Sequence, residues 1–212
     1  MDFGTEFQPT TVQPEEIVEQ SFAMVTAELG AHDFSDEQFP IVRRAIHTSA
    51  DFELGRSLVF HDRAIRSGVQ ALQSGTTIVV DTHMIEVGIT KRYIERFGCK
   101  IDHLPFRLDL GEESTQIGRM ASAIRTTAQK YPDAMYIFGS ESIALMEFIR
   151  LVETRVANPS LIVGVPVGFV HVLEAKNRLM QLDVPHISNH SPKGGSAIAV
   201  SIVNALAIMA GG

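Results

Sequence analysis

The feature that most constrains the fold is an alternation, from residue 76 onward, of short apolar runs with longer amphipathic stretches. The apolar runs are short and rich in β-branched residues, which is typical of strands buried on both faces of a sheet. They cover Thr77–Asp81, Ala134–Phe138 and Leu161–Val165. A short strand over Pro185–Ser188 and an edge strand over Cys99–Asp102 complete the predicted sheet. Helical spacing fills the gaps, over about residues 90–97, 114–130, 142–153, 169–180 and 195–209. This alternation predicts parallel strands joined by right-handed crossovers.

Helical spacing also dominates the first third of the chain. Apolar residues recur at helical intervals over Pro14–Leu29, and Ser35 with Gln38 fits a capping box at the start of a second helix. Pro40 would cost that helix one backbone hydrogen bond, so the alternative is a start a few residues later. A third helix is expected over about residues 62–74. These helices precede the first predicted strand.

The predicted organisation is a flexible tail over residues 1–13 and a single α/β domain over residues 14–212. Within that domain a helical segment (14–75) leads into the strand–helix alternation (76–212). The fold class is a three-layer α/β/α, doubly wound domain with a five-stranded, mainly parallel sheet.

Composition excludes several classes of protein. The net charge of −7 lacks the basic surface that a general nucleic-acid binder needs, and the single cysteine, Cys99, excludes an internal disulfide or a cysteine-based zinc site. No run approaches the roughly 20 apolar residues of a membrane span. The first 13 residues have no basic or apolar region of a secretory signal, so a cytoplasmic protein without a membrane partner is expected.

Polar and glycine-rich segments follow the predicted strands, where ligands of open α/β sheets collect. They are Asp81–Gly88, Gly139–Ser142, Gly164–Val170 and Ser188–Ser196. Three of them lead through Gly or Ser directly into a helix, and helix N-termini attract anions. The alternative is that tight strand–helix turns need these residues for their geometry. Neither a Walker phosphate loop nor a G-x-G-x-x-G motif is present, so a nucleotide is not the favoured ligand.

Histidines raise the questions of a metal site and of acid–base chemistry. No H-E-x-x-H motif occurs, and His186 and His190 span a strand end and a loop, so no bound metal is expected. His47 lies late in the second predicted helix, three residues after Arg44 and four before Asp51. On one helical face, Arg44 would disfavour and Asp51 would favour the imidazolium. The alternative is an exposed histidine with incidental neighbours.

A set of motifs, in order along the chain, resembles the precorrin-8X methylmutase family of corrin biosynthesis. The motifs are Glu19–Phe22 with Glu28, Arg44–Asp51, Asp81-x-x-Met84 with Gly88, Gly118-Arg119, Gly164–Val170 with Glu174 and Lys176, and Lys193–Ser196 with Asn204–Leu206. The resemblance spans the chain from about Pro14 to its end. Its most specific part is Pro-Val-Gly-Phe-Val followed by Lys-Gly-Gly-Ser.

The resemblance implies a flavodoxin-like fold, a homodimer and an isomerase without an organic cofactor. The implied reaction moves a methyl group from C-11 to C-12 of the corrin ring and gives hydrogenobyrinic acid, or cobyrinic acid when cobalt is present. His47 matches the histidine taken to protonate the macrocycle. Ser21, Arg44 and Arg119 match positions near the substrate, whereas His83 matches a variable position and receives no role.

The substrate so implied is a flat apolar macrocycle fringed by carboxylates, and each part of it suggests contacts. Cationic side chains and amides at helix N-termini would bind the carboxylates, and apolar side chains would cover the ring. The predicted substrate contacts are Ser21, Arg44, Thr48, Met84, Arg119, Ser140, Val167, Gly168, Phe169, Val170, Lys193, Gly194 and Gly195. Phe169 could instead be a core residue, and Lys193 and Arg119 could be solvated.

Two other functions are compatible with the sequence. A non-catalytic corrinoid carrier would use the same sheet edge and the same anion donors but would need no acid. A flavodoxin-like regulator or flavin binder is the third hypothesis. Channelling to neighbouring corrin-pathway enzymes is a further possible partnership, and the sequence leaves open whether the natural substrate contains cobalt.

Overall fold

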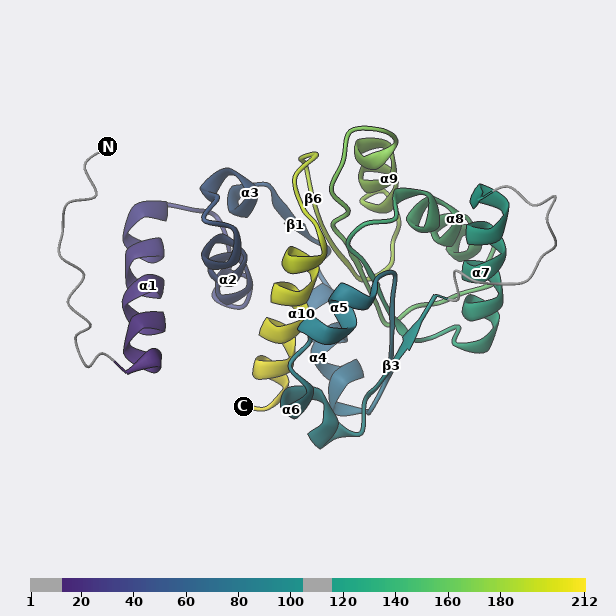
Figure 1. Ribbon diagram of the computed structural model, residues 1–212. Coiled ribbons are helices and arrows are strands. Elements are labelled where there is room, and N and C mark those ends of the chain that lie inside the picture. Colours follow the sequence, from purple (N-terminus) through teal and green to yellow (C-terminus); the bar gives the residue numbers. More distant parts are fainter. Residues whose placement is uncertain (1–12, 105–115) are drawn as a thin grey trace.

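The structure, a computed structural model, describes residues 13–104 and 116–212, with the side chains of residues 14, 15 and 116–119 outside that description. The predicted tail, apart from residue 13, and the first two residues of the helix predicted from Ser114 therefore lie outside the described residues. The described chain forms a central sheet with helices on both faces (Figure 1). The predicted three-layer α/β architecture is confirmed.

The sheet has six strands in the order β1-β6-β5-β4-β2-β3, and every neighbouring pair is parallel except β1 with β6. The strands are β1 (Leu58–Phe60), β2 (Thr77–Val80), β3 (Lys100–His103), β4 (Met135–Phe138), β5 (Leu161–Gly164) and β6 (His186–Asn189). The prediction of five strands was therefore wrong by one. β1 was missed because it has only three residues, too few to show a period of two between two helices.

Most helices lie where helical spacing placed them. They are α1 (Pro14–Leu29), α2 (Phe39–Ser49), α3 (Phe52–Arg56), α4 (Ala64–Gln73), α5 (His83–Gly88), α6 (Lys91–Ile94), the 3₁₀ turn η1 (Glu95–Phe97), α7 (Gln116–Lys130), α8 (Ser142–Glu153), α9 (Val172–Leu179) and α10 (Ser196–Ala210). The bounds of α1 and α8 match the predicted ones. The short helices α3 and α5 were not predicted.

The second helix begins later than the capping box suggested. Ser35 and Gln38 do exchange the two expected hydrogen bonds, at 3.1 and 3.3 Å. They close only a turn, and α2 itself starts at Phe39, with Pro40 in its first turn, where a missing N–H costs nothing.

Two helical layers enclose the sheet. Figure 1 shows α4 and α10 on one face, with α2 and then α1 outside them, and α7, α8 and α9 on the other face. Helix α10 is apolar on nearly all sides because it packs against both the sheet and α2. Its polar residue Asn204 binds the α5–α6 turn, accepting a hydrogen bond from the amide of Thr90 and donating one to the carbonyl of Gly88.

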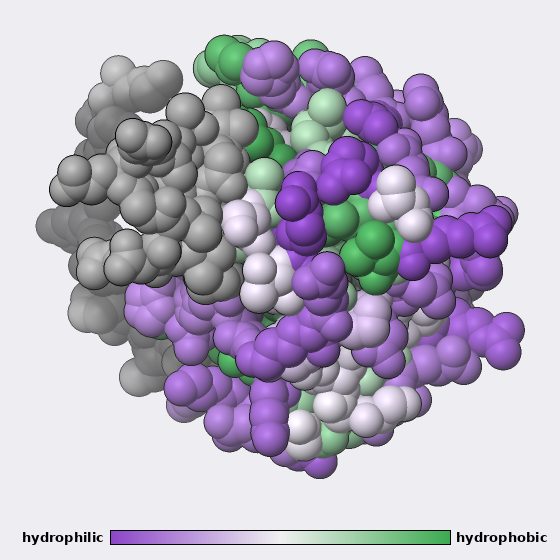
Figure 2. All heavy atoms as spheres, turned by 90° about the vertical axis from the view of Figure 1, so that its right-hand side faces the viewer, coloured by the Kyte–Doolittle hydropathy of each residue, from purple (hydrophilic) through white to green (hydrophobic). Residues whose placement is uncertain are grey.

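The outer surface differs between the two sides of the molecule. Figure 2 shows that the side carrying α7 and α8 is mainly hydrophilic, in agreement with the ion pairs of Glu147 with Arg125 and Arg150 there. Large exposed apolar side chains occur on other elements, among them Met24 on α1 and Met84 and Val87 on α5. Within the described residues, no helix has the length and apolar character needed to span a membrane.

A cluster of aromatic rings fills the layer between β4 and α8 and generates a stability prediction. Phe148 is fully buried, with its ring centroid 3.9 Å from that of Tyr136 and 5.6 Å from that of Phe138. Phe148→Ala should lower the free energy of unfolding by about 3–5 kcal/mol, because it leaves a cavity between packed layers. The same substitution at Phe169, which is 94% exposed, should change it by less than about 0.5 kcal/mol. Urea unfolding measures both, and equal losses would contradict this account of the core.

Candidate active site

A cavity of about 360 Å³ lies between α2, α5 and α10. Both α5 and α10 directly follow the carboxyl ends of strands, β2 and β6, so the cavity has the placement typical of ligand sites in open α/β sheets. The predicted contacts Arg44, Thr48 and Met84 line it. The lining residues that were not predicted are Val87, Gly88, Ala197, Val200, Ser201 and Asn204.

The cavity-lining residues of α10, which were not predicted, share a spacing that is visible in the sequence. Ala197, Val200, Ser201 and Asn204 recur at intervals of three and four, which places them on one side of a helix. That side of α10 could be recognised only once the packing of its other sides was known, because the helix is apolar almost throughout.

His47 lies in the last turn of α2, with its side chain exposed, between the cavity-lining residues Arg44 and Thr48 in the chain. Its ring meets the ring of Phe22 on α1 edge-on, with centroids 5.2 Å apart. The guanidinium groups of Arg43 and Arg44 lie 4.6 and 5.5 Å from the centroid of the same Phe22 ring. Phe22 therefore holds an imidazole and two cations together at one surface.

The expected contact of Asp51 with His47 is wrong. Helix α2 ends at Ser49, Ala50 adopts a left-handed conformation with φ 52°, and the chain turns away. Asp51 instead accepts a hydrogen bond from the amide of Leu54 at 2.9 Å, which caps α3, and forms an ion pair of 2.8 Å with Lys193. Its pKa is lowered by these two contacts.

Lys193 was predicted to bind the substrate, and in the structure its ammonium is already paired within the protein, so that contact stays a prediction. Its ammonium pairs with the carboxylates of both Asp51 and Glu53, each at 2.8 Å, and these carboxylates raise its pKa. The lysine therefore joins the β6–α10 loop to the start of α3.

The amides that follow β4 are also occupied, so the expectation that Ser140 offers its amide to a ligand is wrong. One carboxylate oxygen of Asp81 accepts hydrogen bonds from the amides of Gly139, Ser140 and Glu141, at 3.0, 2.8 and 2.8 Å. Asp81 is 1% exposed, and burial raises its pKa even though the three amides act in the opposite direction. The side chain of Ser140 is exposed. The acceptor of these three amides is thus a side chain of the protein.

Two glycine-containing loops, Val165–Val170 and Ser191–Ser196, bind each other at the same edge of the sheet. The amide of Gly195 donates to the carbonyl of Val165 at 2.8 Å, and that of Gly168 donates to the carbonyl of Pro192 at 3.0 Å. Gly194 has φ +152°, and a Cβ there would collide with the carbonyl of Val165. The predicted glycines therefore serve this close approach, and the amides of Gly168 and Gly195 are not free for a ligand.

The apolar residues predicted in the first of these loops point into solvent. Val167, Phe169 and Val170 are all exposed, so Phe169 is not a core residue. Such exposure of neighbouring large apolar side chains is typical of a binding surface. Ser21 is half-buried on α1 and donates to the carbonyl of Ile17 at 2.7 Å. Arg119 belongs to α7, but its side chain lies outside the described residues.

Lys176 of α9 holds the second loop from inside the protein. Its side chain is fully buried, and its ammonium nitrogen donates to the carbonyls of Ser191 and Lys193 at 2.7 and 2.8 Å. Burial lowers its pKa to about 7. Asn189 adds a second contact, from its side-chain amide to the carbonyl of Lys193 at 3.0 Å.

This burial predicts a pH dependence of stability. Between pH 7 and the value of 10.5 for an unperturbed lysine, the unfolded chain binds a proton at Lys176 that the folded chain lacks. Stability from this residue therefore rises with pH across that window, by about 1 kcal/mol per pH unit, and has no slope below it. Urea unfolding of the wild type and Lys176→Met from pH 6 to 9.5 measures the difference. Parallel curves for the two proteins would contradict the prediction.

Comparisons with known proteins place the chain in one family. The profile of the precorrin-8X methylmutase family matches residues 16–209. A cobalt-precorrin-8 methylmutase of Priestia megaterium is 45% identical, covering 99% of this chain and 94% of the relative. A protein of the same name from Methanocaldococcus jannaschii is 37% identical, covering 82% of this chain and 81% of the relative.

A solved structure shows the same fold. The crystal structure of a precorrin-8X methylmutase from Thermus thermophilus superimposes with a TM-score of 0.82 at 35% sequence identity, covering 92% of this chain and 97% of that one. The family match, the near full-length relatives and the shared fold all point the same way. The chain belongs to the precorrin-8X methylmutase family of isomerases, in the biosynthesis of cobalamin.

Proposed function

We propose that this protein moves a methyl group from C-11 to C-12 of precorrin-8X, or of cobalt-precorrin-8, with His47 as the general acid. The observation that carries the proposal is the position of His47. It is an exposed imidazole beside two residues, Arg44 and Thr48, that line a cavity of about 360 Å³ where α/β proteins bind ligands. The products would be hydrogenobyrinic acid or cobyrinic acid.

The proposed step needs only one proton and no redox chemistry. The imidazolium of His47 gives a proton to the macrocycle, the methyl group migrates to the adjacent ring carbon, and the product returns the proton to the imidazole. Atoms and charge balance, and the protein ends in its starting state. General acid catalysis of this kind is worth about 10²–10⁴-fold in rate.

Arg44 supplies the charge that the ligand requires. Since the amides at Ser140 and Gly168 and the ammonium of Lys193 are engaged within the protein, Arg44 is the cation that reaches the cavity among the described residues. An arginine binds a carboxylate with two parallel hydrogen bonds, which fixes orientation as well as affinity. We infer that it holds an acetate or propionate group of the substrate so that the ring lies next to His47.

The His47→Ala variant tests this assignment. Its kcat should fall by about 10²–10⁴-fold while the affinity for the corrinoid product changes little, because the acid is lost and the binding surface remains. Visible absorption follows the conversion, and equilibrium dialysis follows the binding. His61→Ala is the matched control. His61 lies at the amino end of β6, away from the carboxyl ends of the parallel strands, and its amide donates a hydrogen bond to the carbonyl of His186.

Two outcomes would overturn the assignment. Turnover near the wild-type rate in His47→Ala would remove the histidine from the reaction. A wild-type protein that binds the macrocycle tightly and never isomerises it would favour the corrinoid carrier instead.

We also propose that the protein is a homodimer. Helix α1 packs on α2 but leaves the large apolar side chains of Ile17, Val18 and Met24 exposed. A corrin macrocycle is larger than the cavity within one chain, so a second copy could both cover α1 and enclose the ligand. Channelling to neighbouring enzymes and the cytoplasmic location stay predictions.

Sedimentation velocity tests the dimer. The wild type should sediment as a dimer, and Met24→Asp should shift it toward the monomer because a charge would enter an apolar interface. Glu28→Asp, on the same helix and exposed, conserves the charge and should leave the dimer unchanged. A monomeric wild type would refute the proposal.

A further inference from the structure

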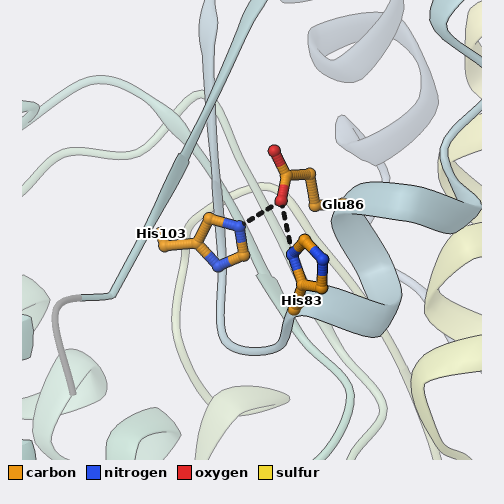
Figure 3. Close-up of side chains that lie close together, drawn as sticks. All are labelled: His83, Glu86 and His103. Carbon is orange, nitrogen blue, oxygen red and sulfur yellow. Dashed lines mark hydrogen bonds and ion pairs between the residues drawn. The ribbon is translucent and has the colours of Figure 1, made fainter.

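Three side chains outside the proposed catalytic group converge next to the cavity: His83 and Glu86 of α5, and His103 at the end of β3 (Figure 3). One carboxylate oxygen of Glu86 lies 2.7 Å from Nδ1 of His83 and 2.5 Å from Nε2 of His103. Figure 3 shows both imidazoles directed at that oxygen. The donor atoms of the three residues all lie within 4.8 Å of one another.

The fold brings these residues together from two separate elements. His83 and Glu86 are three positions apart in α5 and so share one side of the helix. Strand β3 runs parallel to β2, with His103 paired to Val80, so His103 arrives at the carboxyl end of the sheet beside α5. The position of all three is therefore set by the sheet register and by the first turn of α5, which Thr82 caps through the amide of Ile85.

We propose that His83, Glu86 and His103 form a binding site for one divalent transition-metal ion of the Zn²⁺ type. Two imidazole nitrogens and a carboxylate oxygen are a ligand set that zinc accepts in three-residue sites, with a water or an anion in the fourth position. Within the described residues this is the cluster that meets the geometric requirement for a metal.

The site can accommodate the ion with small movements. Zinc lies about 2.0–2.2 Å from nitrogen and oxygen ligands, so the three donor atoms must separate slightly from their present hydrogen-bond distances. His83 can do this by rotating, because its side chain is 77% exposed. The same exposure places the fourth coordination position in solvent, so the ion should exchange and a chelator should remove it.

The alternative is that Glu86 only accepts hydrogen bonds from the two imidazoles. Those two contacts lower the pKa of Glu86, so the carboxylate is ionised and ready for either role. The two roles differ in one measurable way, because a hydrogen-bonded cluster has no affinity for zinc above that of other surface histidines.

The ion would also have a structural consequence. Met84 and Val87 of α5 line the cavity, while His83 and Glu86 face β3. A metal would therefore fix this side of the cavity to the sheet, and saturation with ligand raises the stability of the folded state by mass action. The inference does not depend on the proposed reaction.

The test uses full-length untagged protein, freed of metal with a chelator and titrated with Zn²⁺ alone in a calorimeter. One ion should bind per chain, and the melting temperature should rise. Co²⁺ in place of Zn²⁺ should give visible d–d absorption of a four- or five-coordinate ion. His103→Ala and Glu86→Gln should each weaken Zn²⁺ binding by at least about tenfold, since even the outer partners of metal ligands are worth 10–100-fold.

His171→Ala is the matched control. His171 and Glu174 have the same spacing in the chain and a contact of 3.2 Å, but the described residues bring no third ligand to them. This control should bind Zn²⁺ like the wild type. Absence of Zn²⁺ binding in the wild type, or binding that survives unchanged in His103→Ala, would overturn the proposal, and circular dichroism verifies that each variant is folded.

Discussion

The arrangement of the candidate site depends on the hydrogen bonds of the buried side-chain nitrogen of Lys176. It binds the carbonyls of Ser191 and Lys193 and so fixes the β6–α10 loop against α9. From the outer side of that loop, the side chain of Lys193 reaches Asp51 and Glu53 at the start of α3. Helix α3 follows α2 after a single turn. These contacts therefore connect Lys176, on the α9 side of the sheet, to the helix that carries His47 on the other side.

At the same edge of the sheet, most of the backbone amides predicted to bind an anion form hydrogen bonds within the protein. Asp81 takes the three amides after β4, and the two glycine loops bind each other. These contacts make the edge rigid, and among the described residues they leave exposed apolar side chains there, with Arg44 in the cavity nearby. A ligand suited to such a surface is largely apolar with peripheral carboxylates, which agrees with the macrocycle named for the family.

The sequence predicted the strands and the longer helices because their patterns are local. The runs at β2, β4 and β5 are apolar throughout, and the stripe of α8 has a clear helical period. β1 has only three residues, and the helices α3 and α5, of five and six residues, are too short to show a helical period.

The errors at the site have a different cause. Asp51 was placed on the face of His47 by extending α2 two residues too far, through Ala50, whose left-handed conformation no local signal announces. The partners of Ser140 and Lys193 come from residues 59 and 140 or more positions away, so spacing alone could not show that these groups are engaged. His83 and His103 meet only because of the register between β2 and β3. Contacts between distant parts of the chain thus decide which of the predicted residues remain free to bind a ligand.

The short helix α5 contributes residues to the core, to the cavity and to the histidine cluster. Gly88 lies so close to Val200 of α10 that a Cβ would come within 2.7 Å of it, and Asn204 binds the same turn. Successive residues of a helix rotate by about 100°, so the six residues divide among three directions. Ile85 enters the core, Met84 and Val87 line the cavity, and His83 and Glu86 face β3. A shift of α5 by one residue would exchange all three sets, which is why its close contact with α10 constrains the cavity and the histidine cluster together.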